Sequence, residues 1–243
     1  MNLTGKTAVV TGGGTGIGWG IAHAFAAAGA RVAITGRRDE VLRQAAATWT
    51  GQPAMLCRAC DVADVADVGR LFTWLAKELG PIDIMVNSAG VNIKTRKMSE
   101  MTPEQWSYVM GVNASGAYYC MREVLPQMQQ RQDGIIINVS SISGKRATAL
   151  GGVAYSASKF AVAALGIAVA NENARLGIRI TTIYPGEVNT PILEHRPNPV
   201  SEEHKAAMLQ PADVGQLALA IACLPPRAHV PEVIIKPVHQ EYM

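Results

Sequence analysis

The sequence TAVVTGGGTGIG, residues 7–18, places a short apolar run directly before a glycine-rich turn. Beyond the turn, apolar residues recur at helical spacing from Ile17 through Ile21 and Phe25 to Ala28, and the pattern stops at Gly29. Glycines in such a turn let backbone N–H groups approach an anion at the positive end of a helix. The stretch therefore predicts a strand, a phosphate-binding turn and a helix, in that order.

The glycines of this turn, Gly12, Gly16 and Gly18, follow the spacing G-x-x-x-G-x-G rather than G-x-G-x-x-G. Because a strand precedes the turn and a helix follows it, we predict that these glycines bind the pyrophosphate of a dinucleotide together with Thr15 and Ile17. A glycine-rich connection that binds no ligand is the alternative.

Strand-like runs and helical stretches alternate along the rest of the chain. The further runs cover residues 31–35, 54–60, 82–87, 135–140, 178–185 and 230–237. Near-continuous valine and isoleucine indicate strands that are buried on both faces, as in a parallel sheet covered by helices. We predict an α/β fold with a Rossmann-like doubly wound parallel sheet of about seven strands, three layers α/β/α, in a single domain over residues 1–243.

Composition restricts the classes of protein to which the chain could belong. The 243 residues are 49% hydrophobic and carry a formal net charge of +3, which is too weak to indicate a nucleic-acid partner. No charged and apolar leader is visible, and the longest apolar run, residues 160–170, is too short to cross a bilayer. We expect a soluble cytoplasmic protein with no membrane partner.

Cys57 and Cys60 form a C-x-x-C pair that could indicate a redox motif or half of a zinc site. The chain has no second pair of this kind and no histidine nearby. On a strand, an i,i+3 spacing directs the two side chains to opposite faces. We therefore interpret both as buried structural thiols.

The second strand-like run indicates which dinucleotide is bound. An acidic residue at its end would favour NAD by binding the ribose hydroxyls, but the sequence there is Thr35-Gly36-Arg37-Arg38. Arg37 could bind a 2′-phosphate through its forked guanidinium, with Arg38 as a helper. NADP is therefore favoured over NAD, and a pair of solvated arginines is the alternative.

The segment 186–210 is rich in proline, acidic residues and histidine and lacks a clear period. It follows the end of a strand, where the ligand crevice of an open α/β sheet lies. We predict a mobile lid over the substrate; an inert surface loop is the alternative.

The sequence YSASK, residues 155–159, places a phenol and an ammonium one helical turn apart. Reducing a carbonyl with hydride requires a proton donor, and the reverse reaction requires a base. The ordinary pKa of tyrosine, about 10, is high for this task, and a nearby cation lowers it. We predict that Lys159 lowers the pKa of Tyr155, although a packed core tyrosine is the alternative for this residue taken alone.

Several separated motifs together resemble the short-chain dehydrogenases/reductases, in their shorter single-domain branch. The matching motifs are TGGGTGIG (11–18), CDV (60–62), NSAG (87–90), VNASG (112–116), INVSSISG (137–144), YSASK (155–159) and YPGEVNT (184–190). The resemblance implies an oxidoreductase that transfers hydride between NADP(H) and a carbonyl or secondary alcohol.

The resemblance also implies a role for each motif residue. Ser141 would hold the substrate oxygen, and the family's S-x-x-G pattern selects it over Ser140 and Ser143. Lys159 would bind the nicotinamide ribose, and Asn113 would help a water join the lysine to solvent. The catalytic residues implied are Asn113, Ser141, Tyr155 and Lys159. Further cofactor contacts would come from Asp61 and Val62 at the adenine, from Asn87, Ala89 and Gly90 along the middle, and from Pro185, Gly186, Val188 and Thr190 at the nicotinamide.

Two features depart from the family pattern or leave alternatives. Asn87 could instead bridge two strands. The tail, residues 224–238, lacks a glycine-rich ending and resembles a subset that includes 3-hydroxy-acid dehydrogenases, so the homo-oligomer we expect could be a dimer or a tetramer.

Three alternative functions are open. The basic run KTRK, residues 94–97, could attract a 3-oxoacyl thioester or its acidic carrier, although a solvated loop is the simpler interpretation. The chain could also be an NADP-sensing scaffold without turnover, but such a protein would be expected to lose Tyr155 or Lys159. A lid metal site of Glu194, His195 and His204 lacks an established ligand spacing, and we predict no metal.

Overall fold

Seven parallel strands form one sheet in the computed structural model of the chain, which describes residues 1–241. The strands are β1 (Thr7–Thr11), β2 (Arg31–Gly36), β3 (Leu56–Ala59), β4 (Ile84–Asn87), β5 (Gly134–Val139), β6 (Ile178–Pro185) and β7 (Glu232–Ile235). Their order is β3-β2-β1-β4-β5-β6-β7. The predicted doubly wound parallel sheet is confirmed, and positions 242–243 of the predicted domain lie outside the described residues.

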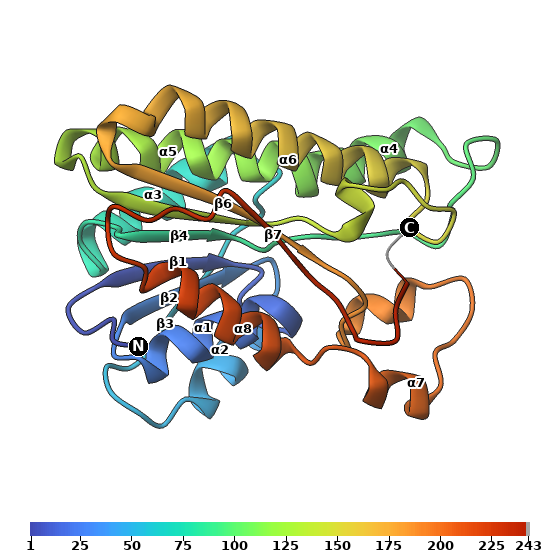
Figure 1. Cartoon of the computed structure of the whole chain (residues 1–243), viewed down its shortest axis with the longest axis horizontal. Coiled ribbons are helices and arrows are strands. Elements are labelled where there is room, and N and C mark those ends of the chain that lie inside the picture. The colour runs from blue at the N-terminus through green and yellow to red at the C-terminus, as the bar shows by residue number, and fades with distance from the viewer. Residues whose placement is uncertain (242–243) are drawn as a thin grey trace.

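Helices cover both faces of the sheet and complete three layers (Figure 1). One layer contains α1 (Gly16–Ala27), α2 (Asp39–Thr48) and α8 (Pro211–Ala222). The other contains α3 (Val65–Glu78), α4 (Pro103–Met110), α5 (Gly116–Arg131) and α6 (Val153–Asn173). Short helical turns lie at η1 (Gly111–Ser115), η2 (Ile142–Gly144), η3 (Ala174–Leu176), η4 (Pro191–His195) and α7 (Glu202–Ala207).

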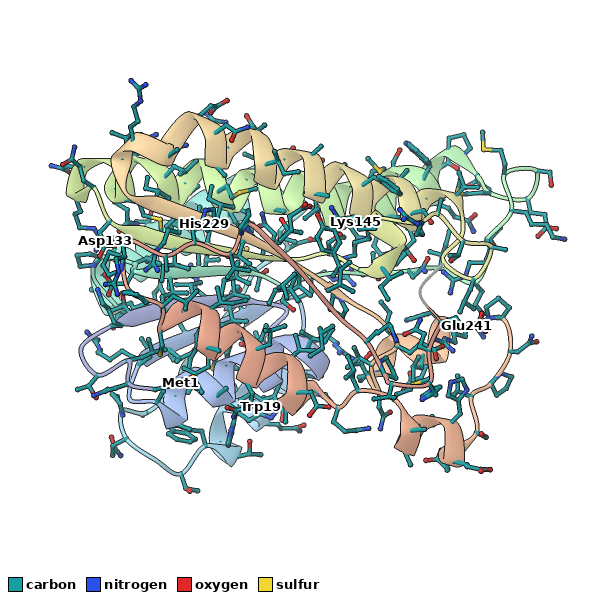
Figure 2. The ribbon with its side chains drawn as sticks, viewed as in Figure 1. Met1, Trp19, Asp133, Lys145, His229 and Glu241 are labelled. Atoms are coloured by element: carbon teal, nitrogen blue, oxygen red, sulfur yellow. The ribbon has the colours of Figure 1, made fainter. Side chains whose placement is uncertain are left out.

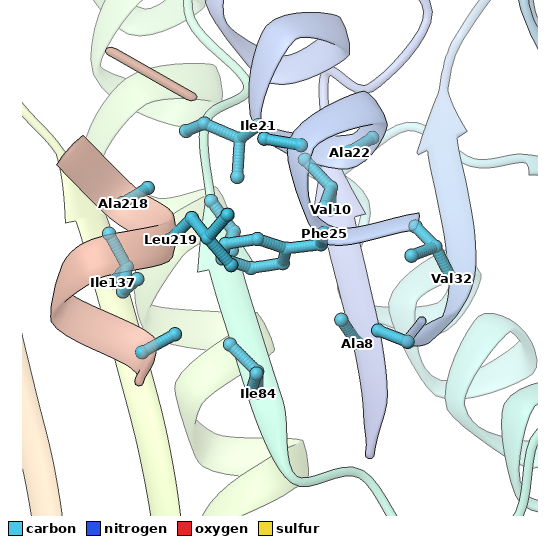
Figure 3. Close-up of a cluster of buried hydrophobic side chains, with 14 of the residues drawn as sticks. Ala8, Val10, Ile21, Ala22, Phe25, Val32, Ile84, Ile137, Ala218 and Leu219 are labelled. Carbon is cyan, nitrogen blue, oxygen red and sulfur yellow. The ribbon is translucent and has the colours of Figure 1, made fainter. Parts of the chain in front are cut away.

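Successive residues of a strand point to opposite faces of the sheet, and they pack into two separate apolar clusters, one on each face. In β1, Ala8 and Val10 join the cluster under α1 and α8, whereas Val9 joins the cluster under α3, α5 and α6. Figure 3 shows Phe25 of α1 and Leu219 of α8 meeting over the sheet in the first of these clusters. Burial on both faces explains why the strands are apolar without interruption.

The chain order reverses direction between β1 and β4, which are neighbours in the sheet. In open α/β sheets, ligands bind at the carboxyl ends of the strands at such a switch point. Thr11, the last residue of β1, fixes the loop after β4, since its Oγ1 accepts hydrogen bonds of 3.1 Å from the backbone N–H groups of Ser88 and Ala89. The glycine turn after β1 and the loop after β4 are therefore held side by side.

The two cysteines of the C-x-x-C pair lie on opposite faces of the sheet, as predicted. Cys60 is buried in one apolar cluster as predicted, whereas Cys57 packs against the other and is only half-buried, because its strand lies at the edge of the sheet; both thiols are free. Burial raises the pKa of Cys57, and burial with the charge of Asp67 raises the pKa of Cys60 to about 12. Neither thiol is prepared to act as a thiolate near neutral pH.

The helical stretch Val153–Leu176 is, by length and composition alone, long and apolar enough to span a membrane. It extends well beyond the apolar run 160–170 that the sequence indicates. Its inner side packs on β6 and carries buried polar groups such as Ser158 and Lys159. We interpret it as the core helix of this layer.

The segment 186–210 carries η4 and α7 at one end of the sheet, where the C-terminal residues also return. Figure 2 shows Glu241 at this end of the molecule, near α7. The C-terminal residues contact the segment 186–210 directly, because the backbone N–H of Glu187 donates a 2.9 Å hydrogen bond to the side chain of Gln240.

Candidate active site

A cleft of about 740 Å³ opens at the carboxyl ends of the strands, across the switch point. It brings together almost all of the residues that the sequence analysis selected; only Asn87 and Asn113 do not line it. The predicted residues on its wall are Gly12, Thr15, Gly16, Ile17, Gly18, Arg37, Arg38, Asp61, Val62, Ala89, Gly90, Ser141, Tyr155, Lys159, Pro185, Gly186, Val188 and Thr190.

The glycine turn makes the first end of this cleft. Gly12 has a φ of +65°, and a Cβ on it would lie 2.9 Å from the Cα of Ala89. A Cβ on Gly18 would lie 2.7 Å from the carbonyl carbon of Gly12, so the turn closes only with glycine at both positions. Thr15 begins α1 without a side-chain cap, and the first turn of α1 has no acidic residue. The N–H groups there suit a pyrophosphate, so the residues present fit a dinucleotide.

Arg37 and Arg38 lie on the cleft wall just after β2, and both are exposed. Arg37 stacks 5.5 Å from the ring centre of Tyr108 and donates a 2.9 Å hydrogen bond to its hydroxyl. Arg38 occupies the N-cap position of α2. Two cations therefore stand where an acidic residue would bind ribose hydroxyls.

Asp61 and Val62 form the wall beside this end. The Asp61 carboxylate accepts a 3.0 Å hydrogen bond from the backbone N–H of Ala63, which fixes its orientation. Val62 is 5% exposed and packs where Gly116 leaves room.

Asn87 takes the bridging position that the sequence left as its alternative. Its Nδ2 donates a 2.9 Å hydrogen bond to Oδ1 of Asn138, joining the ends of β4 and β5. The side chain is buried and does not line the cleft. Asn87 therefore bridges the ends of β4 and β5, and its contact with the cofactor stays a prediction.

Tyr155 and Lys159 share one face of α6, as their spacing predicts. The Lys159 Nζ lies 5.5 Å from the centre of the Tyr155 ring and donates a 2.9 Å hydrogen bond to the carbonyl of Val139, at the end of β5. Lys159 is 5% exposed, and Tyr155 is half-buried with its ring on the cleft wall.

The pKa of Tyr155 is shifted in the direction opposite to the one predicted. Burial raises it, and a hydrogen bond with Ser141 and the charge of Arg96 lower it only in part. Burial lowers the pKa of Lys159 from 10.5 to about 8. The desolvation of the phenol therefore outweighs the groups that lower its pKa, and the lowering of the Tyr155 pKa by Lys159 stays a prediction.

The buried ammonium has a consequence for stability. The pKa of Lys159 in the folded protein lies below its ordinary 10.5 because the ammonium is buried. Burying this charged group at pH 7 therefore lowers the free energy of unfolding. The shift corresponds to about 3 kcal/mol. The penalty is fully present below pH 8 and is relieved as the pH rises toward 10.5, since the unfolded chain binds more protons in that window.

We predict that Lys159→Met raises the free energy of unfolding at pH 7 by about 1–3 kcal/mol, less whatever the hydrogen bond to Val139 contributes. Denaturant unfolding at pH 7 and near pH 10 measures the effect, which should shrink at the higher pH. Lys97→Met, on a side chain that is 75% exposed, is the control and should change little. A Lys159→Met protein that is less stable than the parent at pH 7 would contradict the prediction.

The structure distinguishes the three serines near β5. Ser140 is buried, and its hydroxyl donates a 2.9 Å hydrogen bond to the carbonyl of Lys159, so that it connects the end of β5 to α6. The Ser141 hydroxyl accepts a 3.1 Å hydrogen bond from the backbone N–H of Ser143 and interacts with Tyr155. Ser143 lines the cleft but lacks this link to the phenol. The geometry is consistent with the choice of Ser141.

Asn113 lies in a π-helical turn, η1, and is 2% exposed. Its amide exchanges hydrogen bonds of 2.8 and 3.0 Å with the backbone of Val91 and donates one of 2.9 Å to Ser158. Ser158 in turn donates to the carbonyl of Tyr155. Asn113 therefore connects the loop after β4 to α6, the helix that carries Tyr155. π-helical turns are rare in proteins, and those that occur are often found at functional sites.

The far end of the cleft is formed by segment 186–210 and contains a charged network. Glu187 accepts a 2.8 Å hydrogen bond from Arg196 and lies 2.9 Å from His204 Nε2. Although burial raises the Glu187 pKa, the hydrogen bonds from Arg196 and His204 outweigh this and lower it. Among residues 1–241, the possible metal ligands that come together are Glu187, His204 and His239, within 4.8 Å, and not the lid trio considered from sequence.

Two residues of this end were not selected from the sequence. Arg96 lines the cleft although it belongs to the basic run 94–97, which sequence reasoning placed in solvent. Gln240 lines it from the C-terminal end of the chain. No sequence pattern marks either residue, because their partners lie far away in the chain.

Comparisons with known proteins identify the family of the chain. The profile of the family described as short chain dehydrogenase matches residues 6–200. A Staphylococcus aureus (strain USA300) protein, named as an uncharacterised oxidoreductase, is 34% identical over 236 residues, which cover 97% of this chain and 99% of the relative.

Two solved structures are similar over nearly the whole chain. A serine dehydrogenase complexed with NADP+ matches with a TM-score of 0.87 and 29% identity, covering 97% of this chain and 96% of that one. A 3-ketoacyl-(acyl-carrier-protein) reductase from Brucella melitensis complexed with NADH matches with a TM-score of 0.87 and 28% identity, covering 98% and 99%.

Proposed function

The chain belongs to the short-chain dehydrogenase family of NAD(P)-dependent oxidoreductases, and from that premise we propose that it interconverts a carbonyl and a secondary alcohol with NADP(H). The observation that carries the proposal is the placement of Tyr155, Lys159 and Ser141 on one cleft with a glycine turn at its other end.

The residues of the cleft divide the chemistry among them. When bound, a nicotinamide supplies or accepts the hydride at the substrate carbon. Tyr155 gives its phenolic proton to the carbonyl oxygen in reduction, and its raised pKa keeps that proton in place at neutral pH. Ser141 holds the same oxygen, and Lys159 supplies a cation beside the phenol. In the oxidative direction, Tyr155 first releases its own proton toward solvent and then, as phenolate beside the Lys159 cation, takes up the alcohol proton.

Asn113 would act through other residues. Both N–H groups of its amide donate, to Val91 and Ser158, and its Oδ1 accepts from Val91, so it positions the loop and helix on either side of Lys159. The Lys159 ammonium donates one hydrogen bond, to Val139, and has donors left for a ribose hydroxyl or for a water that leads to solvent. We include this proton relay in the proposal.

The preference for NADP rests on the two cations after β2. We predict that Arg37→Gln with Arg38→Gln raises the KM for NADPH roughly 10- to 100-fold and changes the KM for NADH less than about threefold. Loss of NADPH absorbance during carbonyl reduction measures both constants.

Arg43→Gln is the matched control, because Arg43 lies nearby on α2 but does not line the cleft, pairs with Asp39 at 2.6 Å and is 69% exposed. A parent protein that prefers NADH, or a double variant that loses both cofactors equally, would contradict the roles of Arg37 and Arg38.

The proposal also covers the domain, its location in the cell, the lid and the oligomeric state. The single domain of residues 1–243 would act in the cytoplasm with residues 186–210 as its lid. Tyr118, Phe160 and Ile167 are 44–46% exposed on α5 and α6, which supports a homo-oligomer, dimer or tetramer. A solution mass of 25.8 kDa by light scattering would contradict oligomerisation.

A 3-oxoacyl thioester as substrate is less well supported. The basic run 94–97 does not form one docking surface, because Arg96 turns into the cleft and Lys97 pairs with Glu100 at 2.9 Å. We therefore favour a small carbonyl compound over a carrier-bound one.

A further inference from the structure

Arg96 is the cation of the substrate end that no carboxylate neutralises. It lines the cleft, is half-buried, and forms no ion pair with any residue from 1 to 241. Its Nε is buried and has no hydrogen-bond partner in the described structure. Burying an unpaired cation is unfavourable, so a feature of this kind suggests a missing anion.

The other charges at this end are already accounted for. Arg196 pairs with Glu187 at 2.8 Å, with both side chains about one-sixth exposed, so the two charges cancel. Glu194 lines the cleft but is exposed on η4 and does not bond Arg96. Apart from Lys159, which lies beside Tyr155 and is assigned to the cofactor, the buried part of this end therefore has an excess of one positive charge, that of Arg96.

Backbone carbonyls hold the guanidinium in a fixed orientation. Nη2 donates a 2.8 Å hydrogen bond to the carbonyl of His195, and Nη1 donates one of 3.3 Å to the carbonyl of Gly151. Gly152 allows this approach, since a Cβ on it would lie 2.9 Å from the Arg96 Cδ. A guanidinium has five N–H donors, so others remain for a ligand.

Arg96 is also electrostatically close to the proposed proton donor. Its charge lowers the pKa of Tyr155, which follows Gly152 by three residues along the chain. An anionic group held by Arg96 would therefore lie near a carbonyl held by Tyr155 and Ser141.

We propose that Arg96 recognises a carboxylate on the substrate, so that the protein acts on short oxo acids and hydroxy acids in preference to neutral ketones and alcohols. The inference rests on the proposed function and names the substrate class of that site. A single unpaired guanidinium matches one carboxylate in charge and in its paired donor geometry. The cleft must also hold the cofactor, which favours a small acid.

A purely structural role for Arg96 must be separated from recognition. Its bond to His195 could simply anchor the lid, in which case removing it would affect every substrate alike. Recognition instead predicts an effect that depends on the charge of the substrate. Paired substrates that differ in charge and otherwise only by one methyl group distinguish these two roles.

The experiment measures kcat/KM with NADP+ for 2-hydroxybutanoate and 3-hydroxybutanoate and for the methyl ester of each, in the parent protein, Arg96→Met and Arg96→Lys. We expect the parent to prefer at least one acid over its ester by roughly tenfold or more, the value typical of a charge-assisted hydrogen bond. Arg96→Met should lose that preference through a raised KM for the acid while retaining turnover of the ester, and Arg96→Lys should retain part of it.

Lys97→Met, next in sequence and exposed, is the control and should keep the parent preference. A parent that turns over acid and ester equally, or a preference that survives in Arg96→Met, would overturn the role of Arg96 while leaving the oxidoreductase intact. No cofactor reduction with these pairs or with a panel of neutral secondary alcohols would overturn the proposed function, and the inference with it.

A second measurement needs no variant, in case Arg96→Met fails to fold. Malonate should inhibit the parent competitively against a turned-over alcohol, and malonamide, which lacks the charge, should inhibit at least about tenfold more weakly. Equal inhibition by the two compounds would overturn recognition by Arg96.

Discussion

Tyr155→Phe is expected to lower kcat for carbonyl reduction roughly 10²- to 10⁴-fold, because the variant has no proton to give to the developing alkoxide. The ring stays in place on α6, so the KM for NADPH should change little. The interaction of the hydroxyl with Ser141 is lost, which should cost about 1 kcal/mol of stability and leave the protein folded. Initial rates of NADPH oxidation, with thermal unfolding as a check on folding, measure both effects.

Tyr118→Phe is the matched control for this variant. Tyr118 is 46% exposed on α5 and does not line the cleft, so removal of its hydroxyl should leave the rate unchanged. If the Tyr155→Phe protein retains more than about a tenth of the parent kcat, the phenol is not the proton donor of the reaction.

Gly18→Ala is expected to weaken NADPH binding by about a hundredfold or more. The new methyl group would lie 2.7 Å from the carbonyl carbon of Gly12, so the turn must move and the N–H groups that face the pyrophosphate lose their hydrogen bonds to a charged group, each of which contributes about 1.5–3 kcal/mol. The start of α1 would shift with it, away from the site of the pyrophosphate. Fluorescence titration with NADPH measures the dissociation constant without requiring turnover.

Gly69→Ala makes the same change in another helix, α3, where no atom lies within 4 Å of the new methyl group. Alanine is the better helix former, so this variant should bind NADPH normally and be more stable by about 0.5–1 kcal/mol. Equal NADPH affinity in Gly18→Ala and the parent would mean that the glycine turn does not hold the cofactor.

The sheet could be predicted from sequence because its signal is local. Apolar strands such as Thr7–Thr11 and turn glycines such as Gly29 identify elements without knowledge of their partners. The boundaries were less certain: the run predicted at 54–60 forms a strand only over Leu56–Ala59, the stretch in register with β2, although the Cys60 N–H still donates a 2.9 Å hydrogen bond to the carbonyl of Gly36.

Features that depend on burial could not be predicted in the same way. The spacing of Tyr155 and Lys159 places them on one face, but the direction of the Tyr155 pKa depends on how many atoms surround the phenol, which spacing does not reveal. Arg96 looked like part of a solvated basic run because the carbonyls that turn it inward lie 55 and 99 residues away in the chain. Gln240 reaches the cleft only through the return of the C-terminal segment.

The measurement that tests the central claim most directly follows the hydride itself. The protein is incubated with a carbonyl substrate and NADPH that carries deuterium at one face of nicotinamide C4, and the alcohol is analysed by mass spectrometry. Of the two cofactors labelled on opposite faces, one should transfer its deuterium, which gives a product alcohol with one deuterium on the carbinol carbon. Tyr155→Phe should form almost no labelled product in the same time. Cofactor that binds in the cleft without any deuterium reaching a product alcohol, across the oxo-acid and ketone panel, would contradict it.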